Sequence, residues 1–234
     1  MIEPFQQVLA ELDAAFRRLE GQVPPPVQVE HEGGVVLRYQ EKLAQQALLQ
    51  KFARYISGLR AAHLLLEHGY CQELGVIQRT LDEIEEDVLF ITIGLTGELT
   101  DNHEKYLEHF WMENPGPSNV KRDKIRAFTN SNLEDPSSAN ETGRTIFRTF
   151  SAYVHATSVS IVDMCAGEPV RFQLTGMLDN PLYPDHVEDI WNTFYRGLVT
   201  AVCVAKAFND DELMQERLNS MRAFAAEHAE KVMP

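Results

Sequence analysis

The sequence predicts an all-α protein that folds as a single domain. Apolar residues recur every three or four positions along most of the 234 residues, which is the period of an amphipathic helix. The 11 prolines and 13 glycines gather between these periodic stretches and not inside them. Because no repeat and no clear boundary divides the chain, we expect one bundle of about six or seven helices with a loop-rich insertion.

The first predicted helix covers residues 4–20, where apolar side chains repeat at helical spacing up to Gly21. Three consecutive prolines after it favour a stiff connector. The VQVEHEGGVVLRY segment that follows fits either a short hairpin around its two glycines or a loop. The sequence therefore leaves the structure of residues 21–39 open.

Three more helices are expected in the first half of the chain, over residues 40–68, 71–93 and 101–113. In the first two, apolar residues fall on one face when successive residues are placed 100° apart. An Asn-Pro-Gly-Pro run stops the third of them and opens the insertion, residues 114–141. This insertion is rich in turn-forming residues and has room for a turn of helix around residues 121–128, so its structure also stays open.

The rest of the chain predicts helices over residues 141–165, 184–208 and 210–232, the last with an aspartate at its N-cap. A small extended excursion is expected after Gly167, which ends the first of these helices. The helix over residues 184–208 is apolar on several sides, so we expect it near the core or in a subunit interface. Its large apolar surface leads us to predict a homodimer in solution.

Composition excludes several classes of protein. The formal net charge is -14, which argues against a strongly basic nucleic-acid coat protein. The three cysteines show no CxxC spacing and exclude a disulfide scaffold or a zinc ribbon. The N-terminus has no signal-peptide pattern, and no apolar run is long enough to span a bilayer. These features predict a cytoplasmic protein that does not enter a membrane.

Motifs for metal and cofactor chemistry are missing from the sequence. A di-iron bundle needs Glu-x-x-His pairs, and the chain contains none. Neither a GxGxxG fingerprint nor a phosphate-binding P-loop occurs. We therefore expect no cofactor and no metal, and look for a site made of the protein's own side chains.

Charge is unevenly spread along the chain. Residues 71–113 hold eleven acidic and two basic residues, whereas residues 121–148 hold six basic and four acidic ones. An anionic ligand would find its best prospects in the second stretch. Simple variation in loop charge explains the same pattern, and both interpretations stay open.

One polar column lies in the basic stretch, on the helix predicted over residues 141–165. Arg144, Arg148, Ser151 and His155 follow the spacing i, i+4, i+7, i+11 and share one face. Histidine exchanges protons near neutral pH, and arginine neutralises phosphate through a bidentate fork. Ser151 could orient the imidazole or contact a substrate oxygen.

A second column is expected on the helix predicted over residues 71–93. Arg79, Glu83 and Glu86 fall at i, i+4, i+7 on the face opposite its apolar stripe. Either glutamate could clamp Arg148 or His155 and so support a site. A solvated face or an ordinary salt bridge between helices accounts for the same residues.

The two columns carry a resemblance to a known family. Arg148 and His155, with six residues between them, resemble the Arg-x(4–6)-His motif of HEPN-domain proteins, which are helical bundles of bacterial toxin and defence systems. The pattern Arg79-x3-Glu83 followed by Ser151-x3-His155 is similar to that of uncharacterised HEPN-like families. The resemblance covers roughly residues 40–210, with the helices over residues 4–20 and 210–232 as additions.

The resemblance implies a metal-independent RNA endonuclease in which two such helices meet across a dimer. Arg148 would hold the scissile phosphate and His155 would act on the 2′-OH or the leaving oxygen. A toxin or defence setting would also imply a protein partner such as an antitoxin. The alternative is a non-catalytic binding or regulatory protein in which the Arg/His column is structural, and the net charge of -14 favours it.

Overall fold

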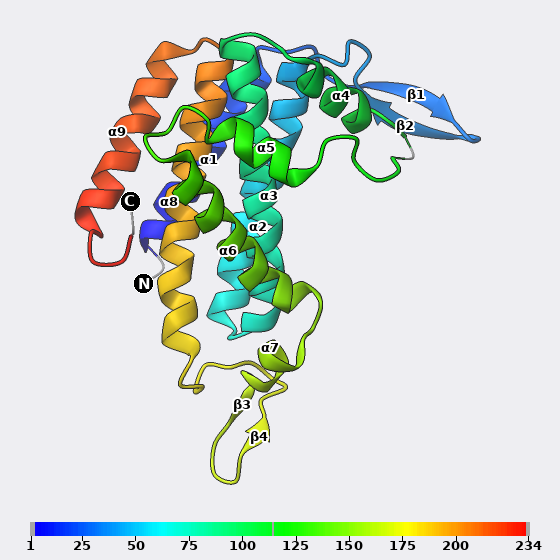
Figure 1. The fold of residues 1–234 in the computed structure, drawn as a ribbon. Helices are drawn as coiled ribbons and strands as arrows, with labels where there is room; N and C mark the ends of the chain where they lie inside the picture. The colour runs from blue at the N-terminus through cyan, green and yellow to red at the C-terminus, as the bar shows by residue number, and fades with distance from the viewer. Residues whose placement is uncertain (1–2, 114, 233–234) are drawn as a thin grey trace.

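Five long helices run side by side and form the body of the molecule (Figure 1). The computed structural model describes residues 3–113 and 115–232. Within them the chain is all-α apart from two small hairpins, as predicted, and it forms nine helices where we expected six or seven. The long helices are α1 (Glu3–Glu20), α2 (Ala44–Glu67), α3 (Cys71–Thr96), α8 (Tyr183–Ala207) and α9 (Asp211–Glu227).

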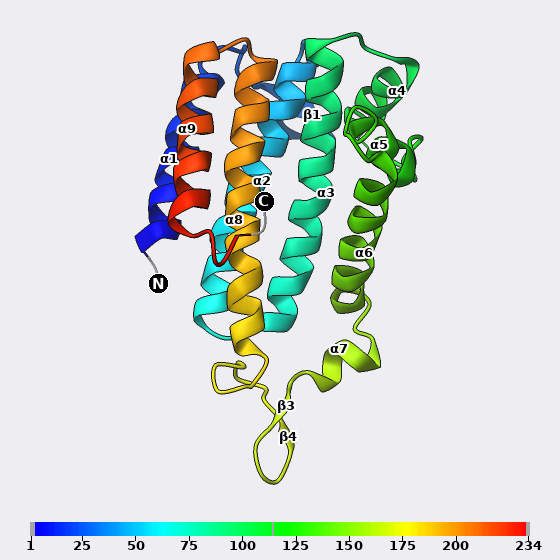
Figure 2. The ribbon, with the colours of Figure 1, turned by 60° about the vertical axis from the view of Figure 1, so that its left-hand side comes forward.

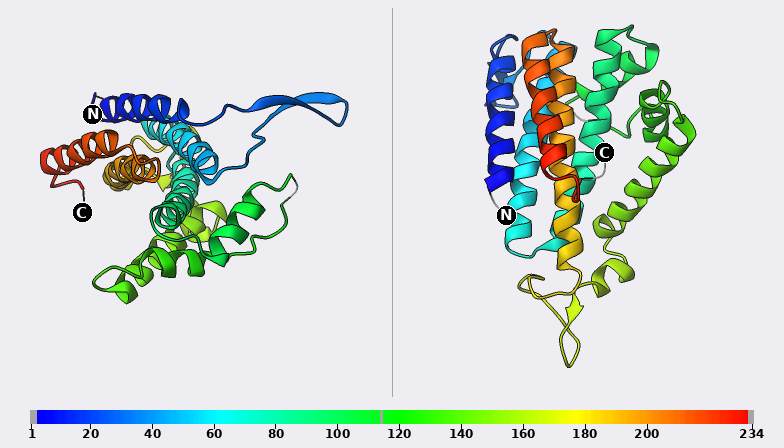
Figure 3. Two further views of the ribbon diagram at one scale, coloured as in Figure 1. Left: turned by 90° about the horizontal axis from the view of Figure 1, so that it is seen from above. Right: turned by 90° about the vertical axis from the view of Figure 1, so that its left-hand side faces the viewer.

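The other four helices form a layer on one side of this body, against α3 (Figure 2). They are α4 (Asp101–Phe110), α5 (Arg122–Thr129), α6 (Pro136–Val154) and α7 (Ser158–Val162). Seen from above, α1 lies along one side of the body and α5 and α6 along the other (Figure 3). The layer therefore has one face on α3 and one face in solvent.

Two antiparallel hairpins project from the body at opposite ends (Figure 1). The first pairs β1 (Val27–His31) with β2 (Gly34–Arg38), which settles the segment that the sequence left as hairpin or loop. Its turn residues Glu32 and Gly33 both have positive φ, 48° and 79°, as a type I′ turn requires. The second pairs β3 (Cys165–Ala166) with β4 (Arg171–Phe172), where a small extended excursion was expected.

The core lies where α1, α2, α3 and α8 meet, and the apolar stripes read from the sequence supply it. Leu12, Leu48, Phe52, Leu59, Leu74, Leu81, Phe194 and Leu198 are at most 2% exposed. Burial of this kind stabilises a fold by about 25 cal/mol for each Å² of apolar surface. The helices predicted over residues 4–20, 40–68 and 71–93 are thereby confirmed to within a few residues.

The apolar surface of helix α8 is buried inside the molecule. Ile190, Trp191, Val204 and Ala205 are buried, and α8 packs against α1, α2, α3 and α9. The expectation of a core position is confirmed. The feature from which we predicted a homodimer is thus accounted for by the packing of one chain.

Helix α6 begins earlier than predicted, at Pro136 instead of residue 141. The Asp135 carboxylate accepts a hydrogen bond from the Ser138 backbone N–H at 3.0 Å, and proline occupies the first turn. Aspartate before proline is a recognised start of a helix, because the missing proline N–H is one that needs no partner there. The insertion also holds α5, two turns of helix in the stretch that the sequence left open as a turn of helix around residues 121–128.

The prediction of one continuous helix over residues 141–165 is wrong. Helix α6 ends at Val154, and α7 follows as a separate short helix. His155 is consequently the C-cap of α6 and not an interior residue. The last helix is likewise shorter than predicted, ending at Glu227 rather than at residue 232.

A Schellman arrangement makes the break after α6. Ala156 has φ of 46°, and its N–H donates to the Tyr153 carbonyl at 3.1 Å. The Thr157 N–H donates to the Ala152 carbonyl, also at 3.1 Å. This motif normally places glycine at the left-handed position, where a side chain costs about 1–2 kcal/mol. With alanine there, the sequence carries no signal for the break.

Candidate active site

Helix α6 sits against α3 through two close contacts. Gly75 of α3 leaves room for the Tyr153 ring, since a Cβ at this position would lie 2.5 Å from the ring's Cγ. One turn further along α3, the Arg79 guanidinium lies 3.6 Å from the centre of the Phe147 ring, a cation–π contact. These contacts fix which face of α6 meets α3 and which face remains free.

Arg79 belongs to this packing and not to an open site. Arg79 is only 8% exposed. Its Nη2 donates to Glu83 at 2.7 Å, and its Nε donates to the Ser151 hydroxyl at 3.3 Å. Ser151 in turn donates to the Phe147 carbonyl at 2.6 Å. Ser151 therefore joins α6 to α3, and does not orient His155.

The carboxylates on the acidic face of α3 form ion pairs with arginines from neighbouring helices. Arg122 and Arg126 of α5 reach Asp87 and Glu86 at 2.5 and 2.7 Å, and Arg196 of α8 reaches Asp82 at 2.5 Å. We call these residues, with Arg79, Glu83, Glu85 and Lys51, the charge seam.

Burial sets the proton affinities in the charge seam. It raises the pKa of Glu86, against the opposing pull of Arg126, and raises that of Glu85 against Arg196. Burial opposes the charge of Arg122, yet Asp87 keeps its pKa above the ordinary value. Glu83 and Glu86 are engaged with arginines other than Arg148, and neither contacts His155. The predicted clamp on the Arg/His column is not formed.

Arg144 and Arg148 lie on the free side of α6 and line a pocket between α5 and α6. Its volume is about 300 Å³. The lining residues are Lys121, Arg122, Asp123, Arg126, Arg144, Phe147 and Arg148. We call this the cation pocket, because five of its seven residues are basic and one is acidic.

The two arginines contributed by α6 are held loosely. Arg144 lies 3.7 Å from Asp123 and 3.5 Å from Glu141, and Arg148 lies 3.7 Å from Glu141. The Arg148 side chain is 71% exposed. An exposed pair at this distance contributes little stability, so both guanidiniums are available to an incoming anion.

His155 is exposed at the C-terminal end of α6, on the side of Arg148. The two are seven positions apart in the chain, which is about 10 Å along the axis and nearly two full turns. The imidazole makes no hydrogen bond or ion pair with the rest of the described chain, whereas its backbone N–H donates to the Ser151 carbonyl. Arg148 and His155 thus share an open face but do not touch.

Sequence reasoning missed the contribution of α5 to this site. Lys121, Arg122 and Arg126 were counted only as part of a basic stretch, and their helix was left as one turn. The i, i+3 spacing of Ile125 and Phe128 in KRDKIRAF is the signal that could have predicted this helix, since both side chains pack in or against the core. The basic stretch over residues 121–148 supplies every residue that lines the cation pocket.

Residues 3–113 and 115–232 contain no cluster of side chains that could bind a metal ion. No three His, Cys, Asp or Glu side chains there are grouped so as to hold a metal ion. In the same residues, every helix is too short or too polar to cross a lipid bilayer. Comparison of the chain with protein-family models, with curated proteins and with solved structures finds no match.

Proposed function

We propose that this protein is a metal-independent RNA endonuclease that holds a phosphate in the cation pocket and transfers protons with His155. The observation that carries the proposal is the contrast within α6. Ser151 on its inner face is hydrogen-bonded to Arg79 of α3, while Arg144, Arg148 and His155 are exposed and have no ion pair shorter than 3.5 Å. The resemblance to HEPN-domain proteins supports the same assignment.

The cation pocket supplies the phosphate contact. Guanidinium groups bind the two non-bridging oxygens of a phosphodiester as a fork, which is stronger than a contact with a single N–H. Arg122 and Arg126 are neutralised by Asp87 and Glu86, so the positive charge that this pocket offers a polyanion comes mainly from Lys121, Arg144 and Arg148.

His155 supplies the proton transfer. In the first step the 2′-oxygen attacks the adjacent phosphorus, the P–O5′ bond breaks, and His155 takes the proton of the 2′-OH. The leaving O5′ needs a proton from a second donor. The products are a 2′,3′-cyclic phosphate and a free 5′-hydroxyl, and the nucleophile comes from the substrate itself.

A second copy of the chain completes this site. Each chain carries one His155, so once that imidazole has taken the proton of the 2′-OH, the leaving O5′ still needs a separate proton donor. In a homodimer, the partner subunit's His155 provides the donor for O5′. We therefore propose that the catalytic unit is a dimer in which two α6 ends meet.

The surface around His155 supports such an interface. Large apolar side chains are exposed over α7, the second hairpin and the loop to α8, which project beyond the body (Figures 1 and 2). We call this surface the apolar tip: Val154, Val159, Ile161, Val162, Val170, Phe172, Leu174, Leu178 and Leu182. An exposed apolar patch beside an incomplete site is typical of a subunit interface.

The proposal sets the protein in the cytoplasm, where RNA is available and free cysteines stay reduced. Cys71, Cys165 and Cys203 are all unpaired. A toxin or defence role would add a neutralising protein that covers the cation pocket or the apolar tip. The competing function is a non-catalytic binding protein, which the net charge favours and which would use the apolar tip for a different partner.

The test is cleavage of single-stranded RNA in the presence of EDTA. We expect the wild type to release products ending in a 2′,3′-cyclic phosphate. His155→Gln should lose cleavage but keep RNA binding, and Arg148→Ala should weaken both. Arg17→Ala is the matched control, because Arg17 is equally exposed on α1, far from α6 in the chain. Wild-type protein that binds RNA without cutting it supports the binding function.

Light scattering tests the dimer. We expect twice the chain mass of 26.6 kDa at micromolar concentration. The double substitution Phe172→Asp and Leu174→Asp should give a monomer that still binds RNA and no longer cuts it, since both side chains are more than half exposed. A wild-type monomer with full cleavage activity contradicts the two-subunit site.

A further inference from the structure

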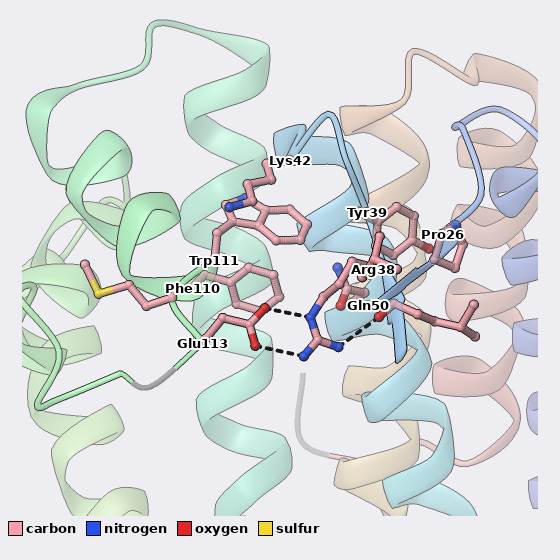
Figure 4. Close-up of a pocket in the computed structure, with 11 residues that line it drawn as sticks. Pro26, Arg38, Tyr39, Lys42, Gln50, Phe110, Trp111 and Glu113 are labelled. Carbon is pink, nitrogen blue, oxygen red and sulfur yellow. Dashed lines mark hydrogen bonds and ion pairs between the residues drawn. The ribbon is translucent and has the colours of Figure 1, made fainter. Parts of the chain in front are cut away.

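A second pocket lies at the other end of the layer, between the first hairpin and the end of α4 (Figure 4). Its volume is about 610 Å³, twice that of the cation pocket. The argument uses six of its lining residues: Arg38, Tyr39, Lys42, Phe110, Trp111 and Glu113. We call it the hairpin pocket.

Aromatic rings from two separate segments form one wall of the hairpin pocket. Tyr39, just after β2, lies 6.2 Å from Trp111 in an edge-on arrangement. Phe110 of α4 lies 5.0 Å from Trp111. The Nε1 atom of Trp111 is buried without a hydrogen-bond partner among the described residues. Aromatic faces lining a hollow offer a stacking surface to a planar ring.

One ion pair joins the two sides of the pocket. Arg38 donates from Nε and Nη2 to the two carboxylate oxygens of Glu113, at 2.7 and 2.8 Å (Figure 4). Both side chains are largely exposed, at 42% and 50%. Because the pair is open to solvent, another anion with two oxygens can exchange with Glu113 on the same guanidinium fork.

Lys42 adds a second cation at the same pocket. Arg38 lowers the pKa of Glu113 most, and His31 and Lys42 add smaller contributions in the same direction; His31 lies 3.9 Å from Glu113. The Lys42 backbone has φ of 54°, a left-handed conformation that costs a residue other than glycine about 1–2 kcal/mol. Strain of this kind is often retained at binding sites.

We propose that the hairpin pocket binds a small planar anion, an aromatic ring bearing a phosphate or a carboxylate. The ring stacks on the face of Trp111 and meets Tyr39 edge-on, because the two side chains are inclined by 66° to each other. The anionic group displaces Glu113 from Arg38 and receives a second contact from Lys42. This proposal is independent of RNA cleavage, because it uses no residue of α5 or α6.

Calorimetric titration with four probes tests the ligand class. We expect 5′-AMP, indole-3-acetate or both to bind, while adenosine and inorganic phosphate, which each lack one half of the proposed ligand, bind at least about tenfold more weakly. Binding of 5′-AMP alone identifies a phosphate ligand, and binding of indole-3-acetate alone identifies a carboxylate. If neither saturates the protein at millimolar concentration, the proposal is wrong.

Two substitutions with opposite expected effects test the displacement. Arg38→Ala removes the anion contact and should weaken binding about tenfold. Glu113→Gln removes the competing carboxylate and should tighten binding severalfold. Arg171→Ala, on the second hairpin, is the matched control and should change nothing. If Glu113→Gln weakens binding as much as Arg38→Ala does, the pair is structural and the proposal fails.

Tryptophan fluorescence places the ligand. The chain has two tryptophans, and Trp191 is 2% exposed in the core, away from the hairpin pocket. We expect ligand to quench the wild type and to leave the fluorescence of Trp111→Phe unchanged. Equal quenching of both proteins would show that the ligand binds elsewhere and would contradict the assignment.

Discussion

The charge seam on α3 and the open face of α6 use the same residue types for different ends. In the seam, Asp82, Glu85 and Asp87 are at most 6% exposed, and each is paired with a cation from another helix. On α6, Arg144 and Arg148 are exposed and their nearest carboxylates are 3.5–3.7 Å away.

The difference teaches that helical spacing alone does not separate a structural charge from an available one. Both columns have the same i, i+4, i+7 pattern in sequence. What distinguishes them is whether another helix covers the face. Arg122 and Arg126 of α5 and Arg196 of α8 cover and neutralise α3, whereas nothing described covers the outer face of α6.

Among these substitutions, Arg196→Ala should lower the free energy of unfolding most, because it removes a cation from the charge seam. It leaves the buried carboxylates of Asp82 and Glu85 without their cation, and stranding buried charges costs about 3–5 kcal/mol of unfolding free energy. Urea denaturation measures this loss. Arg148→Ala is the paired control on the open face and should leave the unfolding free energy nearly unchanged. Similar losses of unfolding free energy for both substitutions would contradict the proposed difference between the charge seam and the open face of α6.

Gly75→Ala should sharpen the comparison by disturbing the seat of α6. The added Cβ meets the Tyr153 ring at 2.5 Å, so α6 must shift outward. Overpacking costs about 1–3 kcal/mol, partly offset by about 0.5–1 kcal/mol of helix propensity gained over glycine. In the Gly75→Ala variant we expect amide hydrogen exchange to speed up in α6 more than in α8, relative to the wild type. At Gly21, where a Cβ has ordinary contacts, alanine should leave exchange in α6 unchanged.

Acidification should weaken the body through its buried histidines. His103 donates from Nε2 to the Phe90 carbonyl at 2.9 Å and accepts at Nδ1 from the Thr100 N–H at 3.0 Å, so it is neutral when folded. Burial lowers its pKa below 6.5, and burial does the same for His186.

The sign of the effect follows from proton uptake. As the pH drops through 6.5, His103 binds a proton in the unfolded chain but stays neutral in the folded chain. The free energy of unfolding therefore falls as the pH drops through 6.5. Urea denaturation over this range measures the slope. His103→Gln should flatten it, and adding His186→Gln should flatten it further. A slope that is the same in the double variant would mean that other groups control it.

The long helices could be predicted from sequence because their apolar stripes are long and regular. Leu48, Phe52 and Leu59 repeat over many turns, and burial of that stripe outweighs local propensities. The same reasoning placed α8 in the core. It then overextended the helix after α5, because Ala156 takes a left-handed conformation that a glycine would have announced.

The candidate site could be predicted only in part. Arg144, Arg148 and His155 were found by spacing, and they do lie on one open side of α6. The predicted roles of Ser151, Glu83 and Glu86 depended on which helices pack together, and that depends on contacts such as Tyr153 against Gly75. The cations of α5 reach the site through tertiary packing, which spacing along one helix cannot show.

The salt dependence of binding to single-stranded RNA tests the central claim most directly. If the open face of α6 contacts phosphates, the logarithm of the binding constant falls linearly with the logarithm of salt concentration. Each phosphate contact contributes about 0.7 to that slope. Arg148→Ala should then lower the slope by about one such increment, while Arg17→Ala leaves it unchanged. Equal slopes for wild type and Arg148→Ala would contradict the account, because Arg148 would then hold no phosphate.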